Sequence, residues 1–484
     1  MRNYNKLSDI QSEIASGTLS CVKLVEHYLK NIQNNKHLNA FIEVYDEEAR
    51  TQAEKIDQKI KNNQQGKLAG MVIGLKDVLC HKDHKLQASS KILDGFTSQF
   101  SGTAIQRLID EDAIIIGRQS CDEFAMGSSN ENSCFGPVRN AADPEKVPGG
   151  SSGASAVAVQ ADMCQASIGS DTGGSVRQPA AFCGVIGLKP TYSRISRFGL
   201  IAYGSSFDCI GPITKSVEDA ALLLEVMAGA DDFDSTVSQK PVDVYSKSLD
   251  SLDGKKLKIG YLKDALESAA IQPEIKESFQ HCLDSLKDSG HEVSAIDLPY
   301  MDKFLPVYYI LTTAEASTNL SRYDGVRYGF RSPNTKDLES MYKKTREEGF
   351  GKEVKKRIML GTFVLSASYV DAFYNKAQKV RRLIKESTEK LLSNHDFLLM
   401  PTTPTTAFKI GEKTTDPLEM YLADIFTVHA NLAGVPAISL PVGHDKNNMP
   451  IGVQVIGNYF NEAKLLAFAH NMMVNSELSL DAKK

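Results

Sequence analysis

Apolar residues recur at helical spacing near the start of the chain and in short unbroken runs further along. The apolar positions between 22 and 32 fall on one face of a helix, so residues 1–65 are predicted to form a helical, largely polar segment. Two short apolar runs follow, at 71–75 and 113–117. Their length and β-branched residues predict buried strands.

Beyond residue 250 the pattern alternates between strands and helices. Residues 257–262 and 291–298 have the spacing of strands, and the helix between them is predicted to begin at Pro273 and to end just before Gly290. The last expected elements are a strand at 397–400 and a helix at 463–473. This alternation predicts one α/β body that spans the whole chain, residues 1–484, as a single domain.

Residues 149–187 are rich in glycine and serine and poor in charge. Eight of these 39 residues are glycine, and only three are charged. The segment also contains apolar stretches, including a helix-like run at 154–161, which an exposed flexible linker lacks. We therefore expect a buried segment whose backbone packs closely against its surroundings.

The charge balance excludes some functions. The chain has 55 basic and 60 acidic side chains, a formal net charge of −5, which argues against a broad surface for a polyanion. It contains no run of 18 apolar residues, and its N-terminus lacks a secretory or transit pattern. These features predict a cytoplasmic protein that does not enter a membrane.

The eight cysteines show no C-x-x-C spacing, so free thiols are expected. Cys80, His81 and His84 come closest to a metal-binding cluster. A closed zinc site needs four ligands and no fourth is evident nearby, so we expect a polar surface loop there and no metal site.

Ser175 is the candidate nucleophile. It ends the run 169–175, in which Thr172, Gly173 and Gly174 can aim consecutive backbone N–H groups at one point, as an oxyanion hole requires. A simple loop is the alternative explanation of the same residues. Neither a G-x-S-x-G elbow nor a phosphate-binding loop is present.

A serine nucleophile needs a base, and Lys76 is the candidate, with a distant histidine as the alternative. A lysine accepts a proton only when it is neutral, and neutrality requires a desolvated site; Lys76 lies in the apolar run 72–78. A strand-end lysine whose amine reaches water is the competing hypothesis. Ser152 suits a helix N-cap, which leaves Ser151 to bridge Lys76 and Ser175.

These segments together resemble the amidase signature family. The matching residues are 74–77, 148–153 and 169–177, in that order, and 182–191 extends the match. The two serines lie 24 residues apart, as they do in the family.

The resemblance implies both a fold and a set of roles. The fold is one mixed β-sheet flanked by helices on both sides, with 149–187 as the catalytic core segment. Lys76 would be the base, Ser151 the bridging serine, on a cis peptide in the family, and Ser175 the nucleophile.

Four further segments resemble one branch of that family, the A subunits of glutamyl-tRNA(Gln)/aspartyl-tRNA(Asn) amidotransferases: 121–133, 315–329, 353–362 and 424–427. This resemblance implies that the chain hydrolyses glutamine and supplies ammonia to a B subunit, which holds the misacylated tRNA and uses ATP and Mg²⁺. A small C subunit would join the two, and this chain would hold no cofactor. The acceptor, Glu-tRNA(Gln), Asp-tRNA(Asn) or both, stays open.

Free glutamine is a zwitterion, so its pocket needs a cation and an anion. Arg357 suits the α-carboxylate because guanidinium binds carboxylate in a fork, and Asp424 suits the α-ammonium. Either Tyr308 or Tyr309 is expected to close the pocket. The alternatives are a structural Arg and Asp on helices, a stand-alone amidase for small amides and an inactive scaffold.

Overall fold

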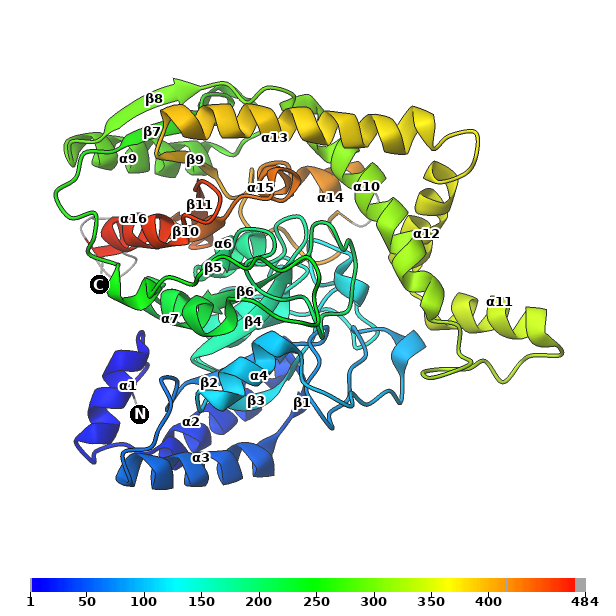
Figure 1. Cartoon of the computed structure of the whole chain (residues 1–484), viewed down its shortest axis with the longest axis horizontal. Helices are drawn as coiled ribbons and strands as arrows, with labels where there is room; N and C mark the ends of the chain where they lie inside the picture. The colour runs from blue at the N-terminus through cyan, green and yellow to red at the C-terminus, as the bar shows by residue number, and fades with distance from the viewer. Residues whose placement is uncertain (1, 414–416, 475–484) are drawn as a thin grey trace.

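The described chain, residues 2–413 and 417–474 of the computed structural model, contains one mixed sheet (Figure 1). Its strands are β1 (Phe41–Val44), β2 (Val72–Lys76), β3 (Ile114–Gln119), β4 (Ala166–Asp171), β5 (Ile186–Lys189), β6 (Cys209–Thr214), β7 (Lys258–Leu262), β8 (Glu292–Ile296), β9 (Phe397–Pro401), β10 (Ala437–His444) and β11 (Pro450–Ile456). The strand order is β1-β3-β2-β4-β6-β5-β10-β11-β9-β7-β8. The predicted α/β fold with a mixed sheet is confirmed.

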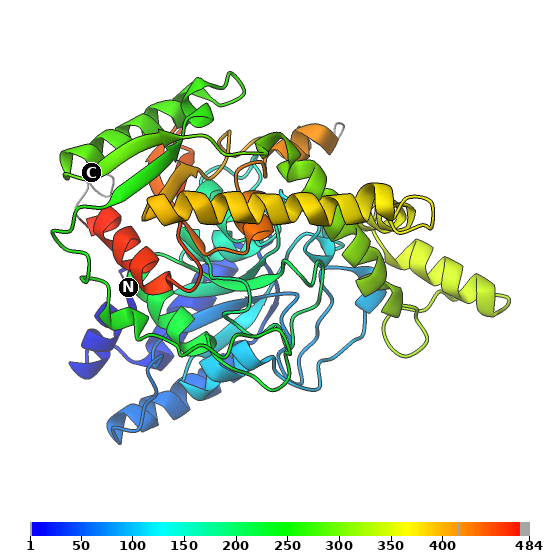
Figure 2. The ribbon, with the colours of Figure 1, turned by 45° about the horizontal axis from the view of Figure 1, so that its top comes forward.

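Helices flank this sheet on both sides (Figures 1 and 2). They are α1 (Leu7–Ala15), α2 (Cys21–Asn34), α3 (Asp46–Lys61), α4 (Thr103–Asp110), α5 (Gly153–Gln160), α6 (Arg177–Cys183), α7 (Val217–Met227), α8 (Asp264–Glu267), α9 (Pro273–Asp288), α10 (Phe304–Asn319), α11 (Leu338–Gly349), α12 (Lys352–Val364), α13 (Lys376–Asn394), α14 (Pro417–Leu422), α15 (Val428–Ala433) and α16 (Glu462–Val474). Within these segments no helix is long and apolar enough to cross a bilayer.

The strand pairing brings the glycine-rich segment next to Lys76. β2 lies between β3 and β4 and runs parallel to both, with Leu75 opposite Ile168. Every residue of β2, β3 and β4 is buried, which is why these strands appear in the sequence as continuous apolar runs. Because parallel strands end at the same edge of a sheet, Lys76 and the residues after Asp171 meet there.

Most of the predicted elements are confirmed, but the first 65 residues are not entirely helical. Phe41–Val44 is an edge strand antiparallel to β3, and it is too short for its spacing to reveal a strand. Elsewhere, α9 begins at Pro273, and Gly290 follows its C-cap with φ +85°. The prediction of a single domain over 1–484 stays a prediction.

Helices α11 and α12 form an arm that projects from the sheet-bearing body (Figures 1 and 2). At the base of this arm, α12 packs along α10. These two helices carry the predicted pocket residues Arg357, Tyr308 and Tyr309, so the arm and the end of β2 approach the same region.

Candidate active site

Lys76 ends β2 and is fully buried. Its Nζ lies 2.7 Å from Ser151 Oγ, 2.9 Å from Ser152 Oγ and 2.9 Å from Ser170 Oγ. No carboxylate forms an ion pair with this amine in the described part of the chain. The hypothesis of an amine that reaches water is therefore wrong: Lys76 lies in a closed cage of hydroxyl groups.

Burial lowers the pKa of Lys76 to about 8, because desolvation penalises the ammonium form. The negative charges of the buried Asp122 and Asp171 oppose this shift but do not cancel it. At neutral pH a fraction of the amine is therefore unprotonated and able to accept a proton.

Ser151 follows a cis peptide bond from Gly150, and its hydroxyl accepts the hydrogen bond from Lys76. Ser175 is adjacent: its carbonyl accepts a hydrogen bond of 3.1 Å from the Ser152 N–H. In the described hydrogen-bond network Ser175 Oγ has no partner, so the Lys76–Ser151 half of the expected relay is formed and the Ser151–Ser175 half is not.

Ser152 stands at the N-cap of α5, as expected, but its side chain caps no N–H group there. Its Oγ contacts Lys76 instead and donates to the carbonyl of Ser170 at 3.2 Å. Sequence reasoning missed Ser170 and the role of Ser152 in the cage, because both contacts depend on the pairing of β2 with β4.

The glycines before Ser175 are required by close packing. A Cβ on Gly173 would lie 2.5 Å from the phenolic end of Tyr308. Gly174 has φ +123°, and a Cβ there would collide with the side chain of Thr427. Thr427 Oγ1 also donates to the carbonyl of Gly173 at 2.7 Å, which fixes the orientation of this turn.

The carboxylate of Asp171 organises the same turn. It accepts from the N–H groups of Gly174 at 2.9 Å and Val176 at 3.2 Å, and it pairs with the buried Arg177. Burial raises the pKa of Asp171, but the charge and hydrogen bonds of Arg177, the Lys189 charge and the Asn431 hydrogen bond outweigh it and hold the pKa at about 2. The Gly174 N–H is therefore engaged, which leaves Thr172 and Gly173 as the backbone donors of the predicted oxyanion hole.

Thr172 is fixed from its side chain. Its Oγ1 donates to Asp208 at 2.6 Å, and Asp208 also accepts from the N–H groups of Tyr203 and Gly204. Burial raises the pKa of Asp208 to about 6. Asp208 therefore connects Thr172 to the loop that carries Tyr203.

Arg357 lies on α12 and is buried. Its Nε donates to Glu353 Oε1 at 2.8 Å, and its Nη1 donates to the hydroxyl of Tyr203 at 2.8 Å. Its guanidinium carbon lies 5.4 Å from the ring centroid of Tyr309. Glu353, one helical turn away, and Tyr203 were not predicted as partners.

Asp424 precedes α15 and is also buried. It accepts a hydrogen bond from Ser128 Oγ, and burial raises its pKa to about 7. The Arg357 charge acts on this carboxylate, yet in the described part of the chain the two residues form no ion pair with each other. The alternative of a structural Arg and Asp stays open, since each residue has a partner of its own within the protein.

Both candidate tyrosines are buried on α10 and take different positions. Tyr308 packs against Gly173, in the turn that precedes Ser175. Tyr309 lies against Arg357, and its ring centroid is 4.0 Å from that of Tyr421. Tyr308 is thus close to the candidate nucleophile Ser175, and Tyr309 is close to the guanidinium of Arg357.

The loop after β2 differs from its prediction. Cys80 and His81 are buried, so the expectation of a polar surface loop is wrong for them. The eight cysteines are free thiols, as expected.

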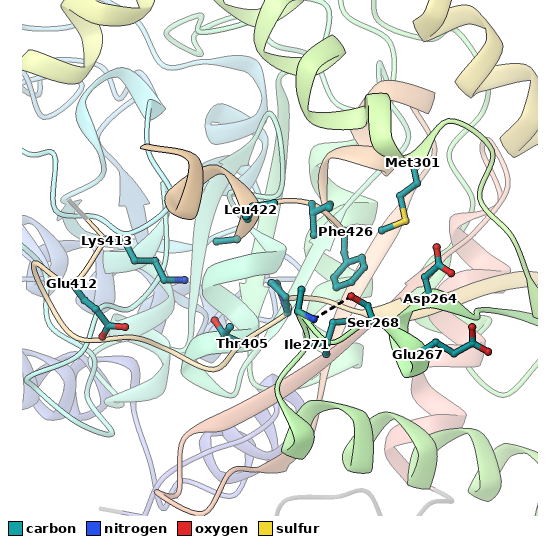
Figure 3. Close-up of a pocket in the computed structure, with 14 residues that line it drawn as sticks. Asp264, Glu267, Ser268, Ile271, Met301, Thr405, Glu412, Lys413, Leu422 and Phe426 are labelled. Carbon is teal, nitrogen blue, oxygen red and sulfur yellow. Dashed lines mark hydrogen bonds between the residues drawn. The ribbon is translucent and has the colours of Figure 1, made fainter. Parts of the chain in front are cut away.

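A cavity of about 640 Å³ lies beside the site (Figure 3). Among the residues that line it are Leu422, Ala423, Ile425 and Phe426, which flank Asp424, together with Met301 and Ile271. Lys76, Ser151 and Ser175 are not among them. The cavity therefore borders the segment that carries Asp424 and is not the candidate catalytic centre.

Comparison with known proteins gives a consistent result. The Amidase family profile matches residues 23–466. The A subunit of glutamyl-tRNA(Gln) amidotransferase from Chlorobium phaeobacteroides (strain BS1) is 48% identical over 475 residues, covering 98% of this chain and 99% of that protein. The protein of the same name from Chlorobaculum parvum is 48% identical over 470 residues, covering 97% and 98%.

Solved structures agree with this result. The crystal structure of the A subunit of glutamyl-tRNA(Gln) amidotransferase from Thermotoga maritima superposes with a TM-score of 0.78 at 41% identity, covering 94% of this chain and 91% of that one. The peptide amidase from Stenotrophomonas maltophilia superposes with a TM-score of 0.82 at 27% identity, covering 97% and 96%.

Proposed function

The chain belongs to the Amidase family, and from this premise we propose that it is the glutamine-hydrolysing A subunit of a glutamyl-tRNA(Gln) amidotransferase. The names of the curated relatives support this proposal, since they align over almost the whole of both chains. The resulting ammonia would be used to convert Glu-tRNA(Gln) to Gln-tRNA(Gln).

One observation carries the catalytic assignment: the 2.7 Å contact between the buried amine of Lys76 and Ser151 Oγ. A lysine acts as a base only when its neutral form is accessible, and the lowered pKa of Lys76 supports that role. Among the three hydroxyls that contact this amine, that of Ser151 is the nearest, and we assign it the bridge to Ser175.

The first half of the reaction is acylation. Ser175 Oγ attacks the side-chain amide carbon of glutamine, its proton passes to Ser151, and the proton of Ser151 passes to Lys76. The negative charge that develops on the amide oxygen faces the N–H groups of Thr172 and Gly173. When the C–N bond breaks, the proton returns from Lys76 through Ser151 to the leaving nitrogen, which departs as ammonia.

The second half is deacylation. Water attacks the glutamyl ester on Ser175 and gives its proton to the same Ser151–Lys76 pair, which then returns a proton to Ser175 Oγ as the ester bond breaks. The products are glutamate and free enzyme. This cycle requires Ser175 Oγ to rotate toward Ser151. Among the described residues Ser175 Oγ makes no hydrogen bond that would oppose this rotation.

The glutamine pocket is formed by Arg357 and Asp424, with Tyr308 and Tyr309 between the charges and the nucleophile. Arg357 is ion-paired with Glu353, and Asp424 accepts from Ser128. In the described chain the two form no ion pair with each other, so neither occupies the position of the other's zwitterion partner. Arg357 is already oriented by Glu353 and Tyr203, so little side-chain order is lost on binding.

We expect the rest of the reaction to take place on partner subunits, in the cytoplasm. Membership of a multi-subunit complex follows from the subunit names of the relatives. In this proposal a B subunit holds the misacylated tRNA and uses ATP and Mg²⁺, a C subunit joins the two, and this chain needs no cofactor of its own.

The test is to purify the chain with and without its native partner subunits and to measure glutamate release, hydrolysis of an uncharged amide, and amidation of Glu-tRNA(Gln) and Asp-tRNA(Asn). The proposal requires glutamine-dependent amidation by the complex and its loss in Ser175→Ala. Efficient hydrolysis of small amides without any use of glutamine would instead identify a stand-alone amidase, and no hydrolysis of either substrate would identify a scaffold.

A further inference from the structure

The loop that follows β2 brings two histidines against the first turn of α3. Glu48, His81 and His84 each present a possible ligand atom, and these three atoms lie within 4.8 Å of one another. The two imidazole rings are stacked, with centroids 3.9 Å apart and planes 7° from parallel. Tyr45, at the start of α3, packs on His84 with a centroid distance of 4.2 Å. The cluster therefore joins two segments that are far apart in the sequence.

Both ring nitrogens of His84 face acceptor oxygens. Its Nδ1 lies 2.7 Å from the carbonyl oxygen of Lys82, and its Nε2 lies 2.7 Å from Glu48 Oε2. A ring nitrogen that donates to a backbone carbonyl fixes the tautomer and leaves the other nitrogen for a metal. A divalent ion between Nε2 and the Glu48 carboxylate would replace the proton that this contact otherwise needs.

His81 supplies the second, independent observation. It is only 7% exposed, and its Nδ1 has no hydrogen-bond partner among the described residues. Buried polar atoms are normally paired, because an unpaired one costs about 1–3 kcal/mol. The unpaired Nδ1 of His81 is therefore available to a ligand.

We propose that Glu48, His81 and His84 form a binding site for a zinc-class divalent ion. Two imidazole nitrogens and one carboxylate oxygen suit Zn²⁺ and the neighbouring transition metals better than Mg²⁺ or Ca²⁺, which take oxygen ligands. Three protein ligands leave a fourth position for water. The lack of an evident fourth ligand in the sequence therefore excludes a closed structural site and not an open one.

Binding requires a small rearrangement. Two ligand atoms at about 2.0–2.1 Å from a tetrahedral ion lie roughly 3.3 Å apart, so the stacked rings must tilt until both lone pairs point at one ion. The geometry permits this movement because Glu48 and His84 are partly exposed on one side, through which an ion can enter. The bound ion would fasten α3 to the loop after β2, whose strand ends at Lys76.

The test uses the full-length chain after chelation, in a Cys134→Ser background, which removes the one exposed thiol of the eight. Calorimetric titration with Zn²⁺ should show one ion per chain, and saturating Zn²⁺ should raise Tm by about 2 °C. Glu48→Gln, His81→Gln and His84→Gln should each weaken Zn²⁺ binding at least tenfold. His281→Gln, at an exposed histidine of α9, is the matched control and should bind as the parent does.

A second readout needs no variant at the site. Co²⁺ should replace Zn²⁺ and give the visible absorption of a four-coordinate ion with nitrogen and oxygen ligands, without a thiolate charge-transfer band. The proposal is overturned if Zn²⁺ gives neither heat nor a change in Tm, or if His81→Gln/His84→Gln binds as tightly as the parent. Neither measurement depends on hydrolysis, so its outcome is separate from that of the proposed function.

Discussion

Ser128 Oγ lies 2.5 Å from Asp424 Oδ2, and it is the one side-chain donor to this buried carboxylate among the described residues. A single hydroxyl does not offset burial, which is why the pKa of Asp424 is raised to about 7. The pKa of Lys76 is lowered to about 8, which is close to the pKa of Asp424. Under the proposed function, glutamine use would depend on two groups that both lose function as the pH falls.

The pH dependence should differ between substrates. Lys76 works as a neutral base and Asp424 as an anion, so both must be deprotonated. Below pH 7 the logarithm of kcat/KM for glutamine should fall with a slope approaching two. An uncharged amide needs Lys76 alone and should show a slope of one. Steady-state assays between about pH 5.5 and 8.5 measure both slopes.

Asp424→Asn is the control for that profile. It keeps the size of the side chain and its contact with Ser128 but removes the charge. We expect a much lower kcat/KM for glutamine, with a slope of one below pH 7. A slope that stays at two in this variant would assign the second proton to another group.

Ser175→Ala should abolish hydrolysis of both substrates. The loss should be about 10⁴-fold or more, as for other serine nucleophiles. Because Ser175 Oγ makes no hydrogen bond in the described network, the free energy of unfolding should change by less than about 1 kcal/mol. Denaturant unfolding and glutamate release measure the two effects. Near-normal turnover in a folded variant would exclude Ser175 as the nucleophile.

Lys76→Arg should be inactive, because a guanidinium cannot give up its proton at any pH of the assay. Arginine is larger than lysine, and position 76 is fully buried. Lys76→Met, an uncharged variant of similar length, is therefore tested as well. Both should lose about 10³-fold or more, with circular dichroism spectra that match the parent. Activity retained by either folded variant would contradict the role of a base.

Arg357→Ala should raise KM for glutamine about 100-fold and leave hydrolysis of an uncharged amide within about threefold of the parent, because only the zwitterion needs the cation. The substitution also removes the ion pair between Arg357 and Glu353. Arg357→Ala/Glu353→Gln removes that secondary effect and should give the same pattern. Equal losses on the two substrates would rule out a carboxylate-binding role.

Thr427→Val should affect the two substrates equally. It removes the hydrogen bond to the Gly173 carbonyl but keeps the branched shape that packs on Gly174. A less rigid oxyanion turn should lower kcat about tenfold with little change in KM. A change confined to glutamine would show that Thr427 acts through the pocket instead.

The sequence allowed the candidate catalytic residues to be located because they lie in short local patterns. Lys76 ends an apolar run, and Ser151 and Ser175 lie in glycine-rich turns, so their approach required only that β2 and β4 be neighbours. The helix from Pro273 to Asp288 was also predicted from local signals, because a proline at its start and a glycine after its end mark its bounds.

The features that could not be predicted from the sequence are contacts between distant segments. Ser170 reaches Lys76 across paired strands, Tyr203 reaches Arg357 from a loop 154 residues away, and Ser128 reaches Asp424 from 296 residues away. The edge strand Phe41–Val44 exists only because β3 offers it partners. Spacing along the chain holds no information about such pairs.

Helices α11 and α12 lie at the edge of the molecule (Figure 1), and we expect α11 to be locally less stable than the sheet. Amide protons of β2 and β4, in the interior of the sheet, should exchange with solvent only when the whole chain unfolds, whereas those of α11 should exchange through local opening. Arg357 lies on α12 and Lys76 on the sheet. As the temperature rises, the preference for glutamine over an uncharged amide should therefore fall before the rate of amide hydrolysis falls.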